Sequence, residues 1–248
     1  MAGHSKFKNI MHRKGAQDQK RAKIFAKLSK EISVAAREGV DQEFNARLRV
    51  AVAAAKAQNM PNDNIKRAIQ RAEGGEADNF EEIRYEGYGP GGVALIAEIL
   101  TDNRNRAASE IRSIFSKNGG ALGETGSVSF MFSRIGIVIY SNNSVHADDI
   151  FNAALEAGAN DIVSSDNRHE VICTPDSFNH VREALEGHFG VSDEAVLVWR
   201  PKDKVQLDSE KVEMLCRLIE ALEDNDDVQT VAVNFDFDQE PSYTASML

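Results

Sequence analysis

Residues 16–38 read AQDQKRAKIFAKLSKEISVAARE, and this stretch carries two separate stripes when it is wound into an α-helix. At 100° per residue, the large apolar side chains fall within one arc of about 100° and the lysines within another of about 80°. The first stripe is typical of a helix that packs on neighbouring helices, whereas the second contains no acid and can face an outside partner. The apolar stripe consists of Ile24, Phe25, Leu28, Ile32 and Ala35, and the second stripe, here called the lysine ridge, of Lys20, Lys23, Lys27 and Lys30.

The ridge belongs to a strongly basic N-terminal region of an acidic protein. Residues 1–30 hold nine Lys/Arg and one acid, and residues 1–75 hold 16 Lys/Arg against 7 Asp/Glu, a net charge of +9. The rest of the chain holds 13 against 32, a net charge of −19, and the whole chain is at −10. An acidic protein with one basic module is expected to bind nucleic acid through that module. The alternative is that the basic and acidic parts neutralise each other within the molecule.

Three helices are predicted in a basic domain of residues 1–77. Gly39 ends the first helix, and residues 59–61 form a turn because Pro61 restricts the residue before it. Residues 1–15 show no periodicity and are expected to form a mostly extended arm. The turn spacing of a helix-turn-helix motif is not evident. The helices are predicted at residues 16–38, 43–58 and 62–72, with Phe44, Leu48, Ala51, Val52 and Ala55 of the second facing inward.

The acidic remainder alternates between strand and helix patterns. Residues 135–200 follow the order β-α-β-β-α-β, which is the ferredoxin-like arrangement. Its strands are predicted at 135–140, 161–164, 168–173 and 195–200 and its helices at 145–157 and 175–188, the second capped by Thr174 with Pro175 at its first position. The part before it has three predicted strands (83–88, 93–100 and about 127–133) and one helix (104–117). A final helix (208–223) and a strand in which Val231, Val233, Phe235 and Phe237 alternate would complete a similar unit. The predicted fold is α+β: a three-helix domain, an α/β domain of residues 78–134 plus 204–240, and a ferredoxin-like domain of residues 135–203 inserted in it.

The candidate binding residues are cations of the arm and the first helix, together with two arginines in the helix that begins near residue 104. Exposed N–H groups in a first helical turn favour anions, although acidic neighbours such as Glu86 or Glu98 are an alternative explanation for these arginines. Phe7, among cations, could stack on a base or anchor the arm. The predicted nucleic-acid-binding residues are Lys6, Lys8, His12, Arg13, Lys14, Lys20, Arg21, Lys23, Lys27, Lys30, Arg104 and Arg106.

Signals for catalysis are missing from the sequence. It has no nucleophile–base signature and no zinc spacing, and its glycine-rich loops at residues 87–92 and 119–126 do not match a P-loop or a dinucleotide fingerprint. Cys173 and Cys216 lie far apart, as expected of buried thiols in a reducing compartment. No apolar run is long enough to span a membrane. We therefore expect a cytoplasmic binding protein without catalytic residues, cofactor, metal, membrane or small-molecule partner; a mitochondrial presequence is an alternative reading of the basic N-terminus.

The motifs Ala2-Gly3-His4-Ser5-Lys6, Tyr85-Glu86-Gly87-Tyr88-Gly89-Pro90-Gly91-Gly92 and Thr101-Asp102-Asn103-Arg104-Asn105-Arg106, with the others given below, resemble those of the YebC family of bacteria. The chain departs from the family pattern at Phe7 and Phe130, where tryptophan is usual, and at Met11, where lysine is common. A phenylalanine keeps a stacking face but lacks the indole N–H donor. The motifs include Ala2-Gly3-His4-Ser5-Lys6, His12-Arg13-Lys14, Lys23-Ile24-Phe25, Asn59-Met60-Pro61, Tyr85-Glu86-Gly87-Tyr88-Gly89-Pro90-Gly91-Gly92, Thr101-Asp102-Asn103-Arg104-Asn105-Arg106 and Lys117-Asn118-Gly119-Gly120.

The resemblance implies a three-domain cytoplasmic regulator of gene expression. The family has been labelled as DNA-binding transcriptional regulators, and this is the function predicted first. Relatives that include the mitochondrial translational activator of cytochrome oxidase subunit I resemble ribosome-associated factors, which bind ribosomal RNA and relieve stalling at proline-rich stretches; this is the alternative. The lysine ridge can hold phosphates without reading bases, and no helix shows an evident base-reading pattern. Recognition by shape and charge therefore suits ribosomal RNA.

Overall fold

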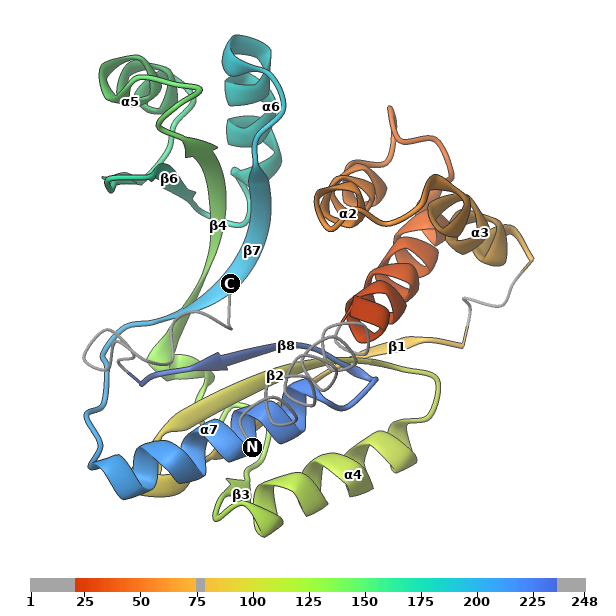
Figure 1. Ribbon diagram of the computed structural model, residues 1–248, viewed down its shortest axis with the longest axis vertical. Coiled ribbons are helices and arrows are strands. Elements are labelled where there is room, and N and C mark those ends of the chain that lie inside the picture. The colour runs from red at the N-terminus through yellow and green to blue at the C-terminus, as the bar shows by residue number, and fades with distance from the viewer. Residues whose placement is uncertain (1–20, 75–78, 236–248) are drawn as a thin grey trace, which may run out of the picture. The chain divides into compact units, whose positions relative to one another are not determined.

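The computed structural model describes residues 21–74 and 79–235 (Figure 1). The chain divides into two compact units. Of the described residues, the first contains 21–74, 79–82, 100–103 and 223–229, and the second contains 83–99, 104–222 and 230–235. The first unit therefore joins the helical N-terminal part to two short segments that are distant in sequence.

The N-terminal part is helical, as predicted. It contains a helix at residues 21–35, the short 3₁₀ helix η1 (Ala36–Glu38), α2 (Ala46–Ala57) and α3 (Asn62–Glu73). Gly39 ends the first helix at φ 138°, a conformation that L-residues rarely adopt. One buried cluster joins all three helices, because each turns an apolar stripe inward. Its members include Ile32, Ala35, Leu48, Val52, Ala55, Met60, Ile65 and Ala68.

The second helix begins three residues later than expected, and the prediction that Phe44 faces inward is wrong. Asn45 caps α2, since its side chain accepts a hydrogen bond from the backbone N–H of Leu48 at 2.9 Å. The same side chain donates to the carbonyls of Ala35 and Gly39. Phe44 therefore lies before the helix, and 87% of its surface is exposed. The buried Asn45 cap, rather than the helical spacing of the apolar residues, therefore determines where α2 begins.

The first sheet has the strand order β3-β1-β2-β8, formed by β1 (Glu81–Tyr88), β2 (Ala94–Thr101), β3 (Ala121–Leu122) and β8 (Val228–Val233). The helices α4 (Arg104–Lys117) and α7 (Ser209–Glu223) lie along the same side of it (Figure 1). β1 passes so close to β3 and α4 that a Cβ atom at Gly87 would lie 2.6 Å from the Ala121 carbonyl oxygen. Glycine is therefore required there.

The second sheet has the order β5-β6-β4-β7, formed by β4 (Phe132–Ser141), β5 (Asp161–Ser164), β6 (Arg168–Cys173) and β7 (Glu194–Pro201). All its pairs are antiparallel, and Val138 of β4 lies opposite Val171 and Ala195. The helices α5 (Ala147–Glu156) and α6 (Phe178–Phe189) contribute Ile150 and Leu185 to one core on this sheet. The ferredoxin-like order is therefore confirmed.

The second sheet interrupts the first along the chain, as the fold class requires. After β7 the chain returns through α7, and β8 pairs beside β2 in the first sheet. The two sheets can be aligned strand by strand. β3 then corresponds to β5, β1 to β6, β2 to β4 and β8 to β7. The exact domain boundaries after residues 77, 134 and 203 stay predictions.

The strand expected around residues 127–133 is absent, and this prediction is wrong. Residues 127–131 form a loop with the 3₁₀ helix η3 (Ser129–Met131), whereas Phe132 and Ser133 begin β4 of the second sheet. The third strand of the first sheet is β3 instead. The loop is held by the buried carboxylate of Glu86, which accepts backbone N–H groups of Val128 and Ser129 at 2.9 and 2.8 Å. These N–H groups are satisfied by a side chain rather than by a strand, and Phe130 is 63% exposed.

Two further element ends differ from the prediction. Residues 174–177 form a turn before α6 rather than its first turn; Thr174 Oγ1 accepts the N–H of Ser177 at 3.3 Å. The last described strand ends at Val233, although an alternating pattern continues beyond it. Phe235 forms an isolated parallel bridge with Val205.

Candidate nucleic-acid interface

The three described members of the lysine ridge all contact the turn that joins α7 to β8, which lies in the same compact unit. We call residues 223–227, with the sequence Glu-Asp-Asn-Asp-Asp, the acidic turn. Lys23 Nζ lies 2.6 Å from Asp224 Oδ1, and Lys27 Nζ donates to the Glu223 carbonyl oxygen at 2.7 Å. Lys30 Nζ donates to the Asp226 carbonyl oxygen and to Asp227 Oδ1, both at 2.8 Å. The ridge thus binds a row of anionic and carbonyl oxygens.

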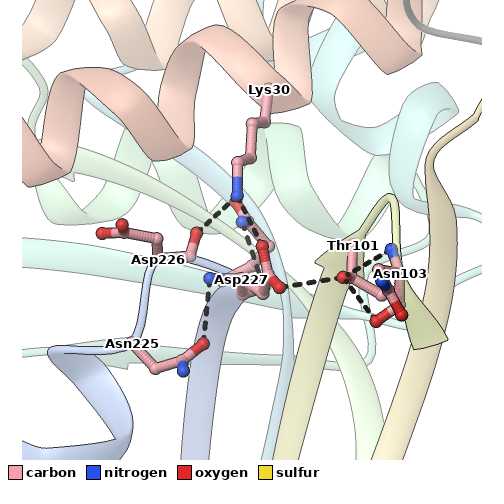
Figure 2. A network of polar contacts seen from close by, with 7 residues as sticks. Lys30, Thr101, Asn103, Asn225, Asp226 and Asp227 are labelled. Atoms are coloured by element: carbon pink, nitrogen blue, oxygen red, sulfur yellow. Dashed lines mark hydrogen bonds and ion pairs between the residues drawn. The ribbon is translucent and has the colours of Figure 1, made fainter. Parts of the chain in front are cut away.

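The contact at Lys30 is the most buried part of this surface (Figure 2). The Asp227 side chain is buried, and its second oxygen accepts the Thr101 hydroxyl proton at 2.8 Å. The Asp227 carbonyl oxygen accepts the N–H of Leu100 at 2.8 Å, which ties the turn to the end of β2. The Lys30 ammonium also lies 5.9 Å from the centre of the Phe80 ring.

Electrostatics differ between the two ends of the ridge. The Lys23–Asp224 pair is exposed at 38% and 72% of its side chains, so solvent screens it. The Lys30–Asp227 pair is exposed at only 21% and 5%. Burial lowers the pKa of Lys27, and the nearby charge of Lys23 acts in the same direction, while the carboxylates of the turn oppose the shift. The ridge is therefore loosely held at one end and anchored at the other.

A hollow in the first unit adds two arginines that the sequence analysis did not include among the site residues. Arg67 and Arg71 are four residues apart on α3 and line it with Ser29, Asn64 and Ala68. Arg67 is oriented by hydrogen bonds to the Asp63 carbonyl oxygen and to Asn64 Oδ1. Guanidinium groups on adjacent helical turns suit a phosphate group. Their i, i+4 spacing is the sequence signal that could have identified them.

Other cations of the basic domain are engaged within it. Arg47 of α2 pairs with Glu31 at 2.9 Å and also with Glu82. The carboxylates raise the pKa of Arg47 against the opposing effect of burial. The Arg21 guanidinium lies 5.3 Å from the centre of the Phe25 ring. Part of the positive charge therefore stabilises the domain itself.

Arg104 and Arg106 occupy the first turn of α4, where the sequence analysis expected them, and both are exposed. They belong to the second compact unit, whereas the ridge belongs to the first. The acids suggested as their partners have other contacts. Glu86 pairs with Arg84 at 3.0 Å, and Glu98 Oε1 lies 2.6 Å from Arg134 Nη1.

Six predicted residues lie outside the described part of the chain, as does Phe7: Lys6, Lys8, His12, Arg13, Lys14 and Lys20. Their binding role stays a prediction. Within residues 21–74 and 79–235, no group of three His, Cys, Asp or Glu side chains could hold a metal ion. No helix in the same ranges is long and apolar enough to cross a membrane.

The glycine loop after β1 forms a tight turn packed on leucines. A Cβ atom at Gly89 would lie 2.9 Å from a Leu95 methyl group and 3.3 Å from methyl groups of Leu215 and Leu218. Cys173 and Cys216 are both buried and are not joined in a disulfide. Burial raises the pKa of Cys173, which makes its thiol less reactive.

Comparisons with known proteins cover nearly the whole chain. The model of the TACO1/YebC protein N-terminal domain matches residues 5–75, and that of the TACO1/YebC second and third domain matches residues 80–235. The crystal structure of the conserved hypothetical protein Aq1575 from Aquifex aeolicus is 42% identical in sequence, with a TM-score of 0.78. The match covers 88% of this chain and 91% of that one. The chain therefore belongs to the TACO1/YebC family, a family of regulators of gene expression.

Proposed function

We propose that this protein regulates gene expression by holding the sugar–phosphate backbone of a nucleic acid through its basic N-terminal domain. The observation that carries the proposal is the lysine ridge, whose three described ammonium groups each bind an oxygen atom at 2.6–2.8 Å. Ammonium groups that bind carboxylate and carbonyl oxygens can bind phosphate oxygens through the same charge-assisted hydrogen bonds. In this structure the contact with the acidic turn is also an internal neutralisation of the ridge, which is the alternative to nucleic-acid binding. The Arg67–Arg71 hollow and the predicted arm residues would extend it.

The chemistry of these groups favours backbone contacts over base readout. Lysine is a flexible point charge, and ammonium contacts to phosphate carry no sequence information. Selection of a promoter requires side chains that reach base edges in a groove. Backbone contacts of this kind favour the ribosome-associated role, in which the protein binds ribosomal RNA and assists translation of proline-rich stretches. Sequence-specific binding to promoter DNA is the second candidate, suggested by the family's label as transcriptional regulators.

Binding measurements on the full chain separate these possibilities. Fluorescence anisotropy with labelled DNA duplexes of unrelated sequence and with a ribosomal RNA hairpin gives the affinity as a function of salt. If about six phosphates are contacted, the logarithmic slope on duplex DNA should be near −5. Strong preference for one DNA sequence would support promoter binding, and equal affinity for all duplexes would contradict it. Absence from ribosome fractions at low salt would contradict the translation role.

Variants test the surface itself. Arg67→Gln combined with Arg71→Gln removes two exposed cations of the hollow and should weaken binding to every nucleic acid alike. Arg200→Gln combined with Lys202→Gln is the matched control, because both are exposed cations in the acidic part of the chain and the pair makes the same change in net charge. An equal effect of the control would show that net charge, rather than this surface, determines binding.

A further inference from the structure

We infer that the acidic turn is an intramolecular competitor for the nucleic acid: it occupies the lysine ridge and must be displaced before the ridge can contact phosphates. The inference rests on the proposed function, since it concerns the same lysines. The inference implies a second state of the lysine ridge, in which the acidic turn has moved away. It identifies the acidic turn as the group that regulates access to the ridge.

The turn offers the ridge what a nucleic-acid backbone would offer. Lysines at positions i, i+4 and i+7 of one helix bind residues that are nearly consecutive in the turn. Two of the acceptors are carboxylates, those of Asp224 and Asp227, and the others are carbonyl oxygens. Because these oxygens lie within hydrogen-bonding distance of each ammonium group, a phosphate cannot approach along the same direction while the turn is in place.

The two ends of the contact, Lys23–Asp224 and Lys30–Asp227, should dissociate in a fixed order. An exposed ion pair such as Lys23–Asp224 contributes only about 0.2–1 kcal/mol, because water and salt screen it. The Lys30–Asp227 end is more buried and is tied to Thr101 and Leu100. A phosphate backbone gains free energy by releasing condensed counterions. It should therefore displace Asp224 first, and a polyanion should succeed where a single phosphate ion fails.

The test replaces Asp224 by asparagine in the full chain. Asp224 is exposed, so Asp224→Asn removes the competing charge with little effect on folding. Loss of a competitor worth 0.2–1 kcal/mol should tighten binding to a 20-base-pair DNA duplex and to an RNA hairpin by about 1.4- to 5-fold at low salt. Asp166→Asn makes the same charge change at an exposed position of the acidic region and should leave the affinity unchanged.

A second pair of variants separates competition for the ridge from simple repulsion of the nucleic acid. If Asp224 acts by occupying Lys23, the gain from Asp224→Asn should disappear in a Lys23→Gln background. If Asp224 merely repels phosphates, the gain should persist there, which would overturn the inference. Unchanged affinity of Asp224→Asn would overturn it as well.

The outcomes also distinguish the inference from the function on which it rests. If the unmodified protein binds and Asp224→Asn binds equally tightly, only the competition is refuted. If neither the protein nor any variant binds DNA or RNA at low salt, the proposed function fails and the inference fails with it. Inorganic phosphate at millimolar concentration should not displace the acidic turn from the lysine ridge, whereas the nucleic acids should. Displacement of the turn by phosphate would show that a polyanion is not required.

Discussion

Removal of the buried charge at Asp227 should reveal how strongly the lysine ridge is anchored. Asp227→Asn keeps the shape of the side chain but replaces one carboxylate oxygen by an NH₂ group. If the remaining oxygen stays near Lys30, the amide group faces the Thr101 hydroxyl, which now donates to Asp227 at 2.8 Å. That hydroxyl can turn toward the Asn103 carbonyl oxygen, 3.3 Å away, so part of the network can rearrange (Figure 2).

The main loss is therefore the charge of the Lys30–Asp227 hydrogen bond. Hydrogen bonds to charged groups contribute about 1.5–3 kcal/mol, and a pair exposed at only 21% and 5% is weakly screened. We expect the free energy of unfolding to fall by about 2 kcal/mol. If the chain unfolds as one cooperative unit, the melting temperature should fall by about 4–8 °C.

A double-mutant cycle isolates this interaction. Asp227→Asn, Lys30→Gln and the double variant are compared with the unmodified protein by urea denaturation followed by circular dichroism. The coupling energy should be about 1–2 kcal/mol in favour of the native pair. Asp226→Asn is a matched control, since Lys30 contacts the Asp226 main chain rather than its carboxylate. A coupling energy below about 0.3 kcal/mol would refute the claim that this pair anchors the ridge.

Three further predictions follow from other contacts. Glu86→Gln should destabilise the protein at pH 7 by about 2–4 kcal/mol. Hydrogen-bond donors and Arg84 outweigh burial and keep the pKa of Glu86 below its ordinary value of 4.5, so the unmodified protein should lose this advantage progressively as pH falls below that value. The difference in the free energy of unfolding between the two proteins, measured by denaturation, should therefore be smaller at pH 3 than at pH 7. Gly87→Ala should cost about 1–3 kcal/mol by thermal melting, since the new methyl group would lie 2.7 Å from the Phe115 ring; an unchanged melting temperature would contradict the close packing of β1. Arg67→Gln with Arg71→Gln should weaken nucleic-acid binding without lowering the melting temperature, and a parallel loss of stability would indicate a structural role instead.

Strong local patterns predicted most elements of the fold. The bounds of α4, β5 and β6 agree with the prediction. For α4 the helical spacing of apolar residues and the glycines that follow it indicate the same element, and the two strands are short apolar runs bounded by polar residues. The predictions fail where a side chain that is distant in sequence accepts the backbone hydrogen bonds that a neighbouring strand was expected to accept. Residues 127–131 of the alternating stretch form a loop because Glu86, more than forty residues away, accepts the N–H of Val128 and Ser129.

The charge segregation, the helical spacing of the lysine ridge and the ferredoxin-like order of elements can all be read from the order of the amino acids, because periodicity and composition are properties of the linear chain. The residues that contact the ridge depend instead on the three-dimensional fold. Lys23 and Asp224 are separated by 201 positions, and no local pattern specifies which distant carboxylate will meet a charged helix face. That pairing depends on the return of α7 and β8 to the first sheet, and so on the packing of the whole chain.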